Sequence, residues 1–386
     1  MRLRDRDSPV TEEGLLFRVY GYNHPPGAWV CDLEYAHESV YVSRDPRALR
    51  EGGTGRFYKF YFDEGLRFVR ERFPQYQVYY KPLRRMLVGV SEDQIREVRR
   101  PDEVLKRLYE SDRSDPLVET MRELLDLVVE HSGLRLGDFG VFGSLLHDFY
   151  HPRYSDIDLT VYGIKEAEKL VETLRELYGA PGTHLRNEFE DWRPEEHPMT
   201  WRFRRYSKAE YGWYQRRKMI YGVYDSERLG RTVKVEFEPV RRWEEIRNEY
   251  SDDLEITNLG FTECVVEVLD DSESMFMPSI YHVEALEGPD VDRVVSYVEE
   301  FRGQLKAGER GVVCGWLEEH RTPRSSMRQI TLTYGPRYFE QCLKLASRSD
   351  RVKLSLSELT PGGDDEQPRR EDSGTRGADR GPKPQA

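Results

Sequence analysis

Two aspartates open a strand near the middle of the chain, and this pattern constrains the fold more than any other feature. Asp156 and Asp158 flank Ile157 and precede the largely apolar residues 159–162. Side chains at positions i and i+2 of a strand point to the same face, whereas the residue between them points to the opposite face. The sequence therefore predicts a strand that buries Ile157 in a core and presents two carboxylates together at a cleft.

A carboxylate pair of this kind suits metal-dependent phosphate chemistry. Mg²⁺ takes hard oxygen ligands and keeps positions open for phosphate oxygens, and two such ions clamp the attacking and leaving oxygens of an in-line displacement. Upstream, Gly143 and Ser144 form a turn whose backbone N–H groups and hydroxyl can bind phosphates, and glycine lets the phosphates approach the backbone closely. The pattern indicates a site for a nucleoside triphosphate with Mg²⁺ or Mn²⁺ as cofactor.

Helices and strands are expected to alternate around these residues. One helix begins after the capping residue Asp115, takes Pro116 in its first position and ends at Gly133. The next expected elements are a strand over 139–142, a short helix over 145–150, a strand over 157–162, a helix over 165–178 and a strand over 233–240. This order favours an α+β fold with a small mixed sheet and flanking helices.

The segment 143–159 resembles the signature of the DNA polymerase β nucleotidyltransferase superfamily. The resemblance rests on Gly143-Ser144-Leu145-Leu146 and on Ser155-Asp156-Ile157-Asp158-Leu159. That superfamily includes CCA-adding enzymes, poly(A) polymerases, oligoadenylate synthetases and antibiotic nucleotidyltransferases. The resemblance covers about residues 115–240 and implies a polymerase β-type core that binds ATP or another nucleoside triphosphate. The whole chain also resembles an uncharacterised group of predicted archaeal nucleotidyltransferases with flanking domains.

The resemblance implies a third acid on a later strand, between apolar neighbours. Glu236 is the best match because it lies between Val235 and Phe237. Glu238 is the second candidate. An aspartate is commoner at this position in the superfamily, although the longer glutamate can still reach a metal ion. We expect Glu236 to lie beside the aspartate pair, and we expect Glu238, which precedes Pro239 at the end of the strand, to lie nearer to the rim.

A basic and aromatic segment separates the aspartates from the third acid. The Trp, Arg and Lys side chains of residues 187–224 include Trp192, Trp201, Trp213, Arg202, Arg204, Arg205, Arg216, Arg217 and Lys218. We expect the segment to help build the wall around the nucleotide or the acceptor. Arg217 and Lys218 can neutralise the charge that develops on a leaving pyrophosphate. A solvated helix face is an equally good interpretation of this basic run.

Changes in composition and in expected secondary structure along the chain predict four regions. We expect an N-terminal α/β region of unknown role over 1–110, a nucleotidyltransferase domain over 111–250 and a β-rich, barrel-like domain over 255–340. The residues 360–386 are dominated by Gly, Pro, Asp, Glu and Arg. Such a segment cannot bury enough apolar surface to offset the entropy of ordering, so we expect a disordered tail.

Charge and cysteine pattern argue against several functional classes. The formal net charge is −12, so a nucleic acid would need a local basic patch. The four cysteines are far apart without a CxxC pair, which argues against a zinc site or a disulfide scaffold. No run approaches the roughly 18 apolar residues of a membrane span. Residues 1–7 lack the apolar stretch of a secretory signal, so we expect a cytoplasmic protein without a membrane partner.

These expectations combine into an enzyme that moves a nucleoside monophosphate from a nucleoside triphosphate to a hydroxyl. Its metal ligands and catalytic acids are expected to be Asp156, Asp158 and Glu236, and its nucleotide-binding residues Gly143, Ser144, Arg217 and Lys218. The acceptor is an RNA end, a protein hydroxyl or a small molecule, with RNA slightly favoured because barrel-like domains often bind nucleic acid. The alternatives are a non-catalytic nucleotide- or RNA-binding module and a protein-modifying enzyme of the toxin-antitoxin type.

Deletion of residues 361–386 is expected to leave the melting temperature and the transfer activity nearly unchanged, because the tail offers no core-forming surface. Thermal unfolding of the full-length and truncated chains would check this. A clear fall in melting temperature on truncation would show that the tail docks on the folded part of the chain.

Overall fold

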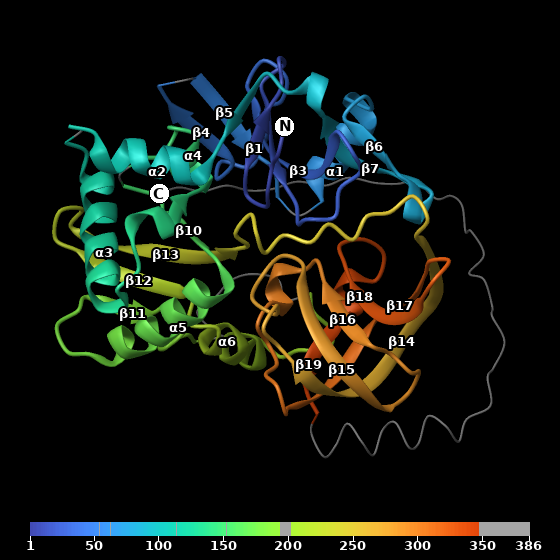
Figure 1. The fold of residues 1–386 in the computed structure, drawn as a ribbon. Helices are drawn as coiled ribbons and strands as arrows, with labels where there is room; N and C mark the ends of the chain where they lie inside the picture. Colours follow the sequence, from blue (N-terminus) through green and yellow to red (C-terminus); the bar gives the residue numbers. More distant parts are fainter. Residues whose placement is uncertain (54, 62, 113, 152, 194–201, 347–386) are drawn as a thin grey trace, which may run out of the picture. The chain divides into compact units, whose positions relative to one another are not determined.

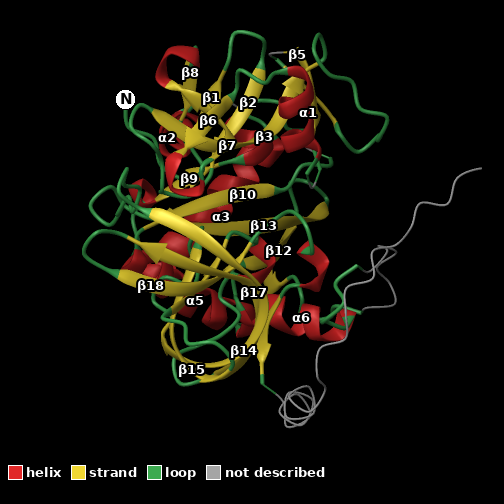
Figure 2. Ribbon diagram, turned by 90° about the vertical axis from the view of Figure 1, so that its right-hand side faces the viewer, coloured by secondary structure: helices red, strands yellow, loops and turns green. Residues whose placement is uncertain are grey.

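The computed structural model describes residues 1–53, 55–61, 63–112, 114–151, 153–193 and 202–346. Residues 1–346 form one compact unit. Strands outnumber helices in it and belong to three sheets (Figures 1 and 2). The structure is therefore a mixed α/β fold rich in β-structure. The predicted tail over 360–386 and Trp201 lie outside the described residues.

The N-terminal sheet has eight strands. Six follow the order β4-β5-β3-β2-β1-β8, while β7 pairs with β3 and β6 pairs with β7. The strands are β1 (Ser8–Val10), β2 (Leu15–Val19), β3 (Ala28–His37), β4 (Leu49–Gly52), β5 (Gly55–Lys59), β6 (Gln77–Tyr80), β7 (Arg85–Ser91) and β8 (Glu97–Arg99). Helix α1 (Glu64–Arg72) covers one face and buries Val69 in a core with Phe17 and Leu33.

The central sheet has five strands in the order β11-β12-β13-β10-β9. Its strands are β9 (Phe139–Val141), β10 (Ile157–Tyr162), β11 (Leu185–Asn187), β12 (Tyr221–Ser226) and β13 (Arg231–Val240). The pair β10–β13 is parallel and the other pairs are antiparallel, so this is a mixed sheet, as predicted. The helices around it are α2 (Pro101–Glu110), α3 (Pro116–Ser132), α4 (Gly143–Leu146), α5 (Ile164–Gly179) and α6 (Lys208–Arg217).

Local sequence signals explain the bounds of α3. The Asp115 carboxylate accepts hydrogen bonds from the backbone N–H groups of Leu117 (2.9 Å) and Val118 (3.3 Å). Pro116 takes the first helical position, where a missing N–H costs nothing. Gly133 ends the helix with φ of 62°, in the left-handed region that glycine tolerates best. The predicted start and end of this helix are confirmed.

The two faces of the central sheet differ in chemistry. Ile157, Leu159 and Val161 of β10 are fully buried in one core with Val235 and Phe237 of β13. Helices α3 and α5 contribute their apolar faces to the same core. Strand alternation sends the residues between these apolar positions to the opposite face, which carries the aspartates and the glutamates of β13. The candidate site must therefore lie on the face away from α3 and α5.

The C-terminal sheet has six strands in the order β14-β15-β16-β18-β17-β19. They are β14 (Glu255–Asp270), β15 (Ser279–Glu287), β16 (Arg293–Ser296), β17 (Arg310–Arg321), β18 (Ser326–Leu332) and β19 (Cys342–Leu345). Because β17 also pairs with β14, five of these strands form a closed circuit of hydrogen-bonded neighbours. The circuit leaves β19 as an additional strand beside β17.

Short 3₁₀ helices connect several strands. They are η1 (Lys81–Leu83), η2 (Glu92–Gln94), η3 (Leu136–Asp138), η5 (Glu299–Phe301) and η6 (Tyr338–Glu340). Of these, η5 matters most for the site because it carries two glutamates to the charged face of the central sheet. In the part of the chain that the structure describes, no helix is long and apolar enough to cross a membrane.

The backbone of the β4–β5 hairpin is in direct contact with the backbone of the loop after α4. A Cβ atom added at Gly52 would lie 2.2 Å from the backbone oxygen of Asp148 and 2.5 Å from Cα of Phe149. The Phe149 ring packs against Tyr35 of β3 and Phe57 of β5, with ring centroids 4.8 and 5.4 Å apart. The N-terminal sheet is thus in direct contact with the segment that follows the Gly143–Ser144 turn.

Gly52→Ala is expected to destabilise the protein by about 1–3 kcal/mol, because its methyl group would clash with the backbone of Asp148 and Phe149. Gly53→Ala is the matched control, since its Cβ would meet only Asp148 Oδ2 at 3.7 Å. Denaturant unfolding of both variants would measure the difference. Equal stability of the two would contradict the close backbone contact.

Candidate functional site

A cavity of about 330 Å³ opens on the charged face of the central sheet. It is lined by Asp156, Asp158, Glu188, Phe189, Tyr211, Gln215, Tyr221, Lys234, Val235, Glu236, Glu299 and Glu300. Six of these residues are acids, and Lys234 is the one Lys or Arg among them. So many like charges around one cavity repel one another, and a bound cation would relieve that repulsion.

Strand pairing brings the three predicted acids together. Asp158 lies directly opposite Glu236 in the parallel pair β10–β13, and Asp156 immediately precedes β10. All three side chains line the cavity. Val235 and Phe237 are buried on the other side of the strand, so they fix the backbone on either side of Glu236. The structure thus places Glu236 beside the aspartate pair, as the sequence predicts.

The Gly143 turn lies against the second aspartate. Gly143 has φ of 61°, and a Cβ atom there would be 2.2 Å from Asp158 Oδ2. The backbone N–H of Phe142 donates to the backbone oxygen of Asp158 (3.0 Å), which holds the turn at the edge of β10. Ser144 follows and is 7% exposed. Only glycine fits both the backbone conformation and the close approach at position 143.

Burial and mutual repulsion dominate the electrostatics of the acids. Burial and the neighbouring Asp156 carboxylate raise the pKa of Asp158 to about 7. Burial also raises the pKa of Asp156, although Lys234 opposes that shift. Within the described residues, no three His, Cys, Asp or Glu side chains already converge as a metal-binding group. The oxygen donors of the three acids nevertheless match the preference of Mg²⁺ or Mn²⁺, and their crowding is the condition that such an ion relieves.

Glu238 lies deep in the structure, so the expectation that it lies near the rim is wrong. Its side chain is 2% exposed. It pairs with the guanidinium of Arg302, which is fully buried, and with Arg6 (2.7 Å). Although burial opposes ionisation, Arg302 and Arg6 hold the pKa of Glu238 well below its usual range. Pro239 does follow Glu238, but segments from outside the central sheet cover this end of β13.

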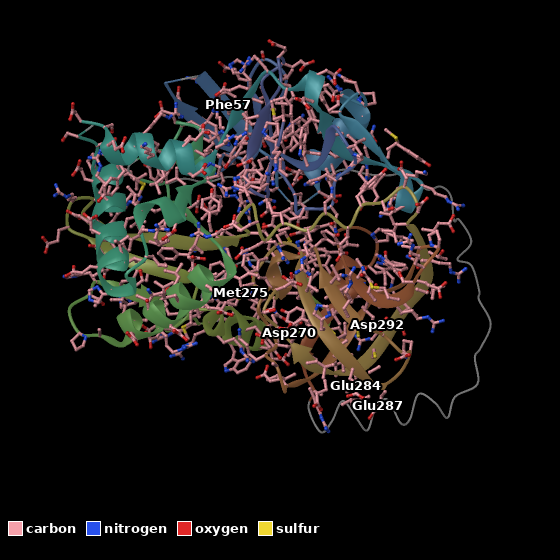
Figure 3. The ribbon with its side chains drawn as sticks, in the orientation of Figure 1. Phe57, Asp270, Met275, Glu284, Glu287 and Asp292 are labelled. Atoms are coloured by element: carbon pink, nitrogen blue, oxygen red, sulfur yellow. The ribbon has the colours of Figure 1, made fainter. Side chains whose placement is uncertain are left out.

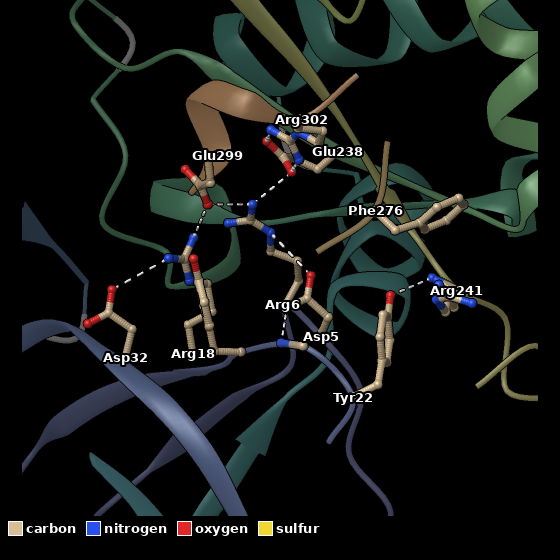
Figure 4. Close-up of polar contacts among 12 residues, drawn as sticks. Asp5, Arg6, Arg18, Tyr22, Asp32, Glu238, Arg241, Phe276, Glu299 and Arg302 are labelled. Carbon is tan, nitrogen blue, oxygen red and sulfur yellow. Dashed lines mark hydrogen bonds and ion pairs between the residues drawn. The ribbon is translucent and has the colours of Figure 1, made fainter. Parts of the chain in front are cut away.

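These contacts extend into a chain of buried charges, shown in Figure 4. Arg6 also pairs with Glu299 of η5 (2.9 Å), and Arg18 of β2 pairs with the same Glu299 carboxylate (3.0 Å). Arg302 Nη2 lies 3.8 Å from Glu236 Oε1 as well. The chain therefore connects the N-terminal sheet, β13 and η5, and it reaches the third acid of the candidate site.

The two cations assigned to the nucleotide are engaged elsewhere. Lys218 is 1% exposed and donates to Gln215 Oε1 (2.7 Å) and to the backbone oxygens of Glu300 (2.9 Å) and Glu299 (3.4 Å). Burial, followed by Arg302, lowers the pKa of Lys218 to about 7. Arg217 Nη2 donates to both carboxylate oxygens of Glu309, Oε1 at 2.8 Å and Oε2 at 3.0 Å. Neither residue lines the cavity, so the structure does not bring them to the acids.

Aromatic residues form another part of the cavity wall. Phe189 and Tyr221 contact each other with ring centroids 5.8 Å apart, and Tyr211 of α6 joins them in the lining. Phe189 and Tyr211 come from the segment that the sequence marks as aromatic and basic. Two tryptophans of this segment do not line the cavity, because Trp213 is 50% exposed and Trp192 packs against Gly212. Flat apolar faces beside acids suit a nucleobase or ribose next to metal-bound phosphates.

Sequence reasoning did not find Glu299 and Glu300. They lie on η5, more than 60 residues after Glu236 along the chain, and reach the cavity only through tertiary packing. Burial raises the pKa of Glu300, whose Oε1 accepts a hydrogen bond from the Tyr338 hydroxyl (2.9 Å). No local motif marks these residues. Arg302 lies three residues after Glu299 and is buried, and its ion pair with Glu238 of β13 holds this segment against the central sheet.

The chain is similar over most of its length to an uncharacterized protein of Methanocaldococcus jannaschii. The two are 27% identical over 321 residues, which cover 83% of this chain and 92% of the relative. No protein-family model matches the chain, and no solved structure matches it. The function must therefore be argued from the chemistry of the site itself.

Glu238→Gln is expected to destabilise the protein by about 3–5 kcal/mol, because it leaves the buried Arg302 and Arg6 without their shared counter-charge. Glu236→Gln is the control on the same strand and face. Its side chain is 31% exposed and its ion pair with Arg302 is long, at 3.8 Å, so we expect little change in stability. Denaturant unfolding would compare the two, and a larger loss for Glu236→Gln would contradict this assignment.

Proposed function

We propose that the protein is a metal-dependent nucleotidyltransferase of the DNA polymerase β type, which moves a nucleoside monophosphate from a nucleoside triphosphate to a hydroxyl. The observation that carries the proposal is the convergence of Asp156, Asp158 and Glu236 on one cavity beside the Gly143 turn. Two acids on one strand and a third on its parallel neighbour are an economical way to build a donor set for divalent ions.

The three acids would hold Mg²⁺ or Mn²⁺. When bound, these ions supply neutralisation of phosphate charge and polarisation of the reacting oxygens. The chain itself supplies position. Asp156 and Asp158 are fixed by the buried residues that alternate with them, and Glu236 is fixed in the same way by its strand neighbours. Glu236 is also placed to accept the proton of the acceptor hydroxyl.

The remaining lining residues fit the other parts of a nucleotide. The turn at Gly143 and Ser144 is buried and does not line the cavity, but it lies against the Asp158 carboxylate. Phosphates held by ions at Asp158 would therefore lie near its backbone. Phe189, Tyr211 and Tyr221 offer faces for the base or the ribose. The cavity volume of about 330 Å³ falls in the range of small-molecule sites, so it suits one nucleotide.

The acceptor is better sought among small molecules and protein hydroxyls than among RNA ends. The closed strand circuit of the C-terminal sheet supports a barrel-like interpretation, which is the basis for favouring RNA. However, residues 255–346 contain 16 Asp and Glu against nine Lys and Arg. Asp270, Glu284, Glu287 and Asp292 are exposed on this sheet and its loops (Figure 3). Such a surface repels a phosphate backbone.

A non-catalytic nucleotide-binding module is the second candidate on the same fold. It would keep the cavity and dispense with metal chemistry. Six acids around the cavity count against it, because a triphosphate would meet strong repulsion there without divalent ions. The carboxylate crowding is costly in the absence of a ligand, and a simple binder gains nothing from it.

Asp156→Asn, Asp158→Asn and Glu236→Gln should each lower kcat by about a hundredfold or more, because each removes a donor to the ions that stabilise the transition state. The melting temperature should not fall, since the loss of one carboxylate relieves repulsion at Asp158, whose pKa burial and Asp156 raise to about 7. Incubation with each labelled triphosphate, Mg²⁺ or Mn²⁺, and extracts of RNA, protein and small molecules would measure transfer.

Glu284→Gln on the exposed C-terminal sheet is the control and should transfer at the normal rate. Normal turnover by Asp158→Asn with Mg²⁺ would refute the metal site. Binding of triphosphates by the wild-type chain without transfer to any acceptor would favour the non-catalytic module.

A further inference from the structure

The proposed function leaves the triphosphate short of a protein cation. Phosphoryl-transfer sites usually add a Lys or Arg to the metal ions, because one side chain must neutralise charge on the leaving phosphates. Arg217 and Lys218 are bound to other groups, and Lys234 pairs with Glu188. A cation for the phosphates would then have to come from residues outside the central sheet.

Lys59 is such a residue, at the last position of β5. It lies directly opposite Tyr35 in the antiparallel pair β3–β5, so both side chains point to the same face of the N-terminal sheet. Its Nζ lies 6.0 Å from the centroid of the Tyr35 ring and 5.9 Å from that of Tyr61. Phe57, two residues earlier on β5, shares this face.

This face of the N-terminal sheet covers the segment that follows Gly143 and Ser144. The Tyr35 ring contacts His147 and Phe149 with centroids 5.4 and 4.8 Å apart, and the Phe57 ring contacts Phe149 at 5.4 Å. Gly52 of β4, the strand that pairs with β5, makes a close backbone contact with Asp148 and so holds the β4–β5 hairpin in place as well. Lys59 is therefore held at the phosphate end of the candidate site by packed rings and by backbone contact.

The charge of Lys59 acts on the catalytic aspartates. After burial and Asp156, which raise the pKa of Asp158, Lys59 is the largest influence that lowers it. Lys59 also lowers the pKa of Asp156. Even so, its ammonium makes no hydrogen bond and no ion pair within 4.0 Å to any residue that the structure describes. The side chain is half-buried, so an unbonded ammonium there has lost part of its hydration.

We propose that Lys59 is the triphosphate-binding cation of the site, and that the N-terminal sheet exists in this chain to complete the nucleotide pocket. The inference rests on the proposed function. Lys59 does not itself line the cavity. Its face of the N-terminal sheet packs on His147 and Phe149, which follow the Gly143 turn, and its charge acts on both aspartates. An unbonded ammonium so held would reach the non-bridging oxygens of the β- and γ-phosphates that extend from the cavity toward this sheet. Charge-assisted hydrogen bonds from a partly desolvated lysine to phosphate are among the stronger polar contacts.

A different role would give a different result. If Lys59 only balanced the charge of Asp156 and Asp158, its removal would strengthen Mg²⁺ binding. The affinity for triphosphate would then not fall. If Lys59 binds phosphate, its removal weakens binding in proportion to the phosphates present. Nucleosides, which lack phosphates, should then bind the variant as well as they bind the wild-type chain.

Lys59→Met should weaken binding of ATP, GTP, CTP or UTP with Mg²⁺, and of inorganic tripolyphosphate, by about tenfold to a hundredfold. Lys59→Arg should restore most of the affinity, and Lys106→Met, on the exposed side of α2, should bind normally. Calorimetry with the full chain would measure each affinity, and the corresponding nucleosides are the phosphate-free controls. Unchanged affinity of a folded Lys59→Met chain for all these ligands would overturn the proposal.

A second measurement uses the wild-type chain and does not depend on the folding of a variant. Acetylation of lysines followed by mass spectrometry should show that tripolyphosphate with Mg²⁺ protects Lys59 and not Lys106. Protection of neither lysine at saturating ligand would overturn the role of Lys59. If the wild-type chain binds no triphosphate at all, the proposed function fails; if it binds and transfers while Lys59 stays reactive, only this inference fails.

Discussion

The burial of Arg302 is the constraint on which the arrangement around the site depends. Its guanidinium is fully buried, and Glu238 of β13 supplies its counter-charge, which Arg302 shares with Arg6. A buried charge without a partner costs several kcal/mol, so the three segments that carry these residues must come together or none can be buried. Arg6 has φ of 71°, an unfavourable backbone conformation for a residue with a side chain, which its ion pairs help to offset.

This network also explains how η5, which lies outside the central sheet, contributes acids to the cavity. The position of Glu299 depends on the same network, because Arg6 and Arg18 both pair with its carboxylate. Burial opposes its ionisation, but the two arginines lower the pKa of Glu299 to about 2. Glu299 is therefore charged at neutral pH and fixed in place, and its neighbour Glu300 is carried to the cavity wall. Glu299 is thus held by ion pairs to Arg6 and Arg18, which come from outside the cavity lining.

Local chemistry made the central strands and their acids predictable, whereas long-range pairing hid the rest. The alternation around Asp156 and Glu236 specifies which face each side chain takes, and β10 has the predicted bounds. The position of Glu238 was predicted wrongly, because its neighbour Pro239 suggested a strand end open to solvent. Arg302 and Arg6, which bury it, lie 64 and 232 residues away in sequence. No periodicity or motif connects residues at such separations.

The distribution of charge gives the N-terminal sheet a physical role that its own sequence does not reveal. Six of the twelve residues that line the cavity are acids, and most cations near it are bound to carboxylates or backbone oxygens. Divalent ions at the acids would neutralise part of the phosphate charge, and phosphoryl-transfer sites usually add a protein cation to that neutralisation. A cation from a separate sheet, Lys59 beside the rings of Tyr35 and Tyr61, would add to that neutralisation without an ion pair that would have to break first. The central sheet would on this argument be incomplete by itself, because the acids that suit metal ions repel the substrate that the metal ions must hold.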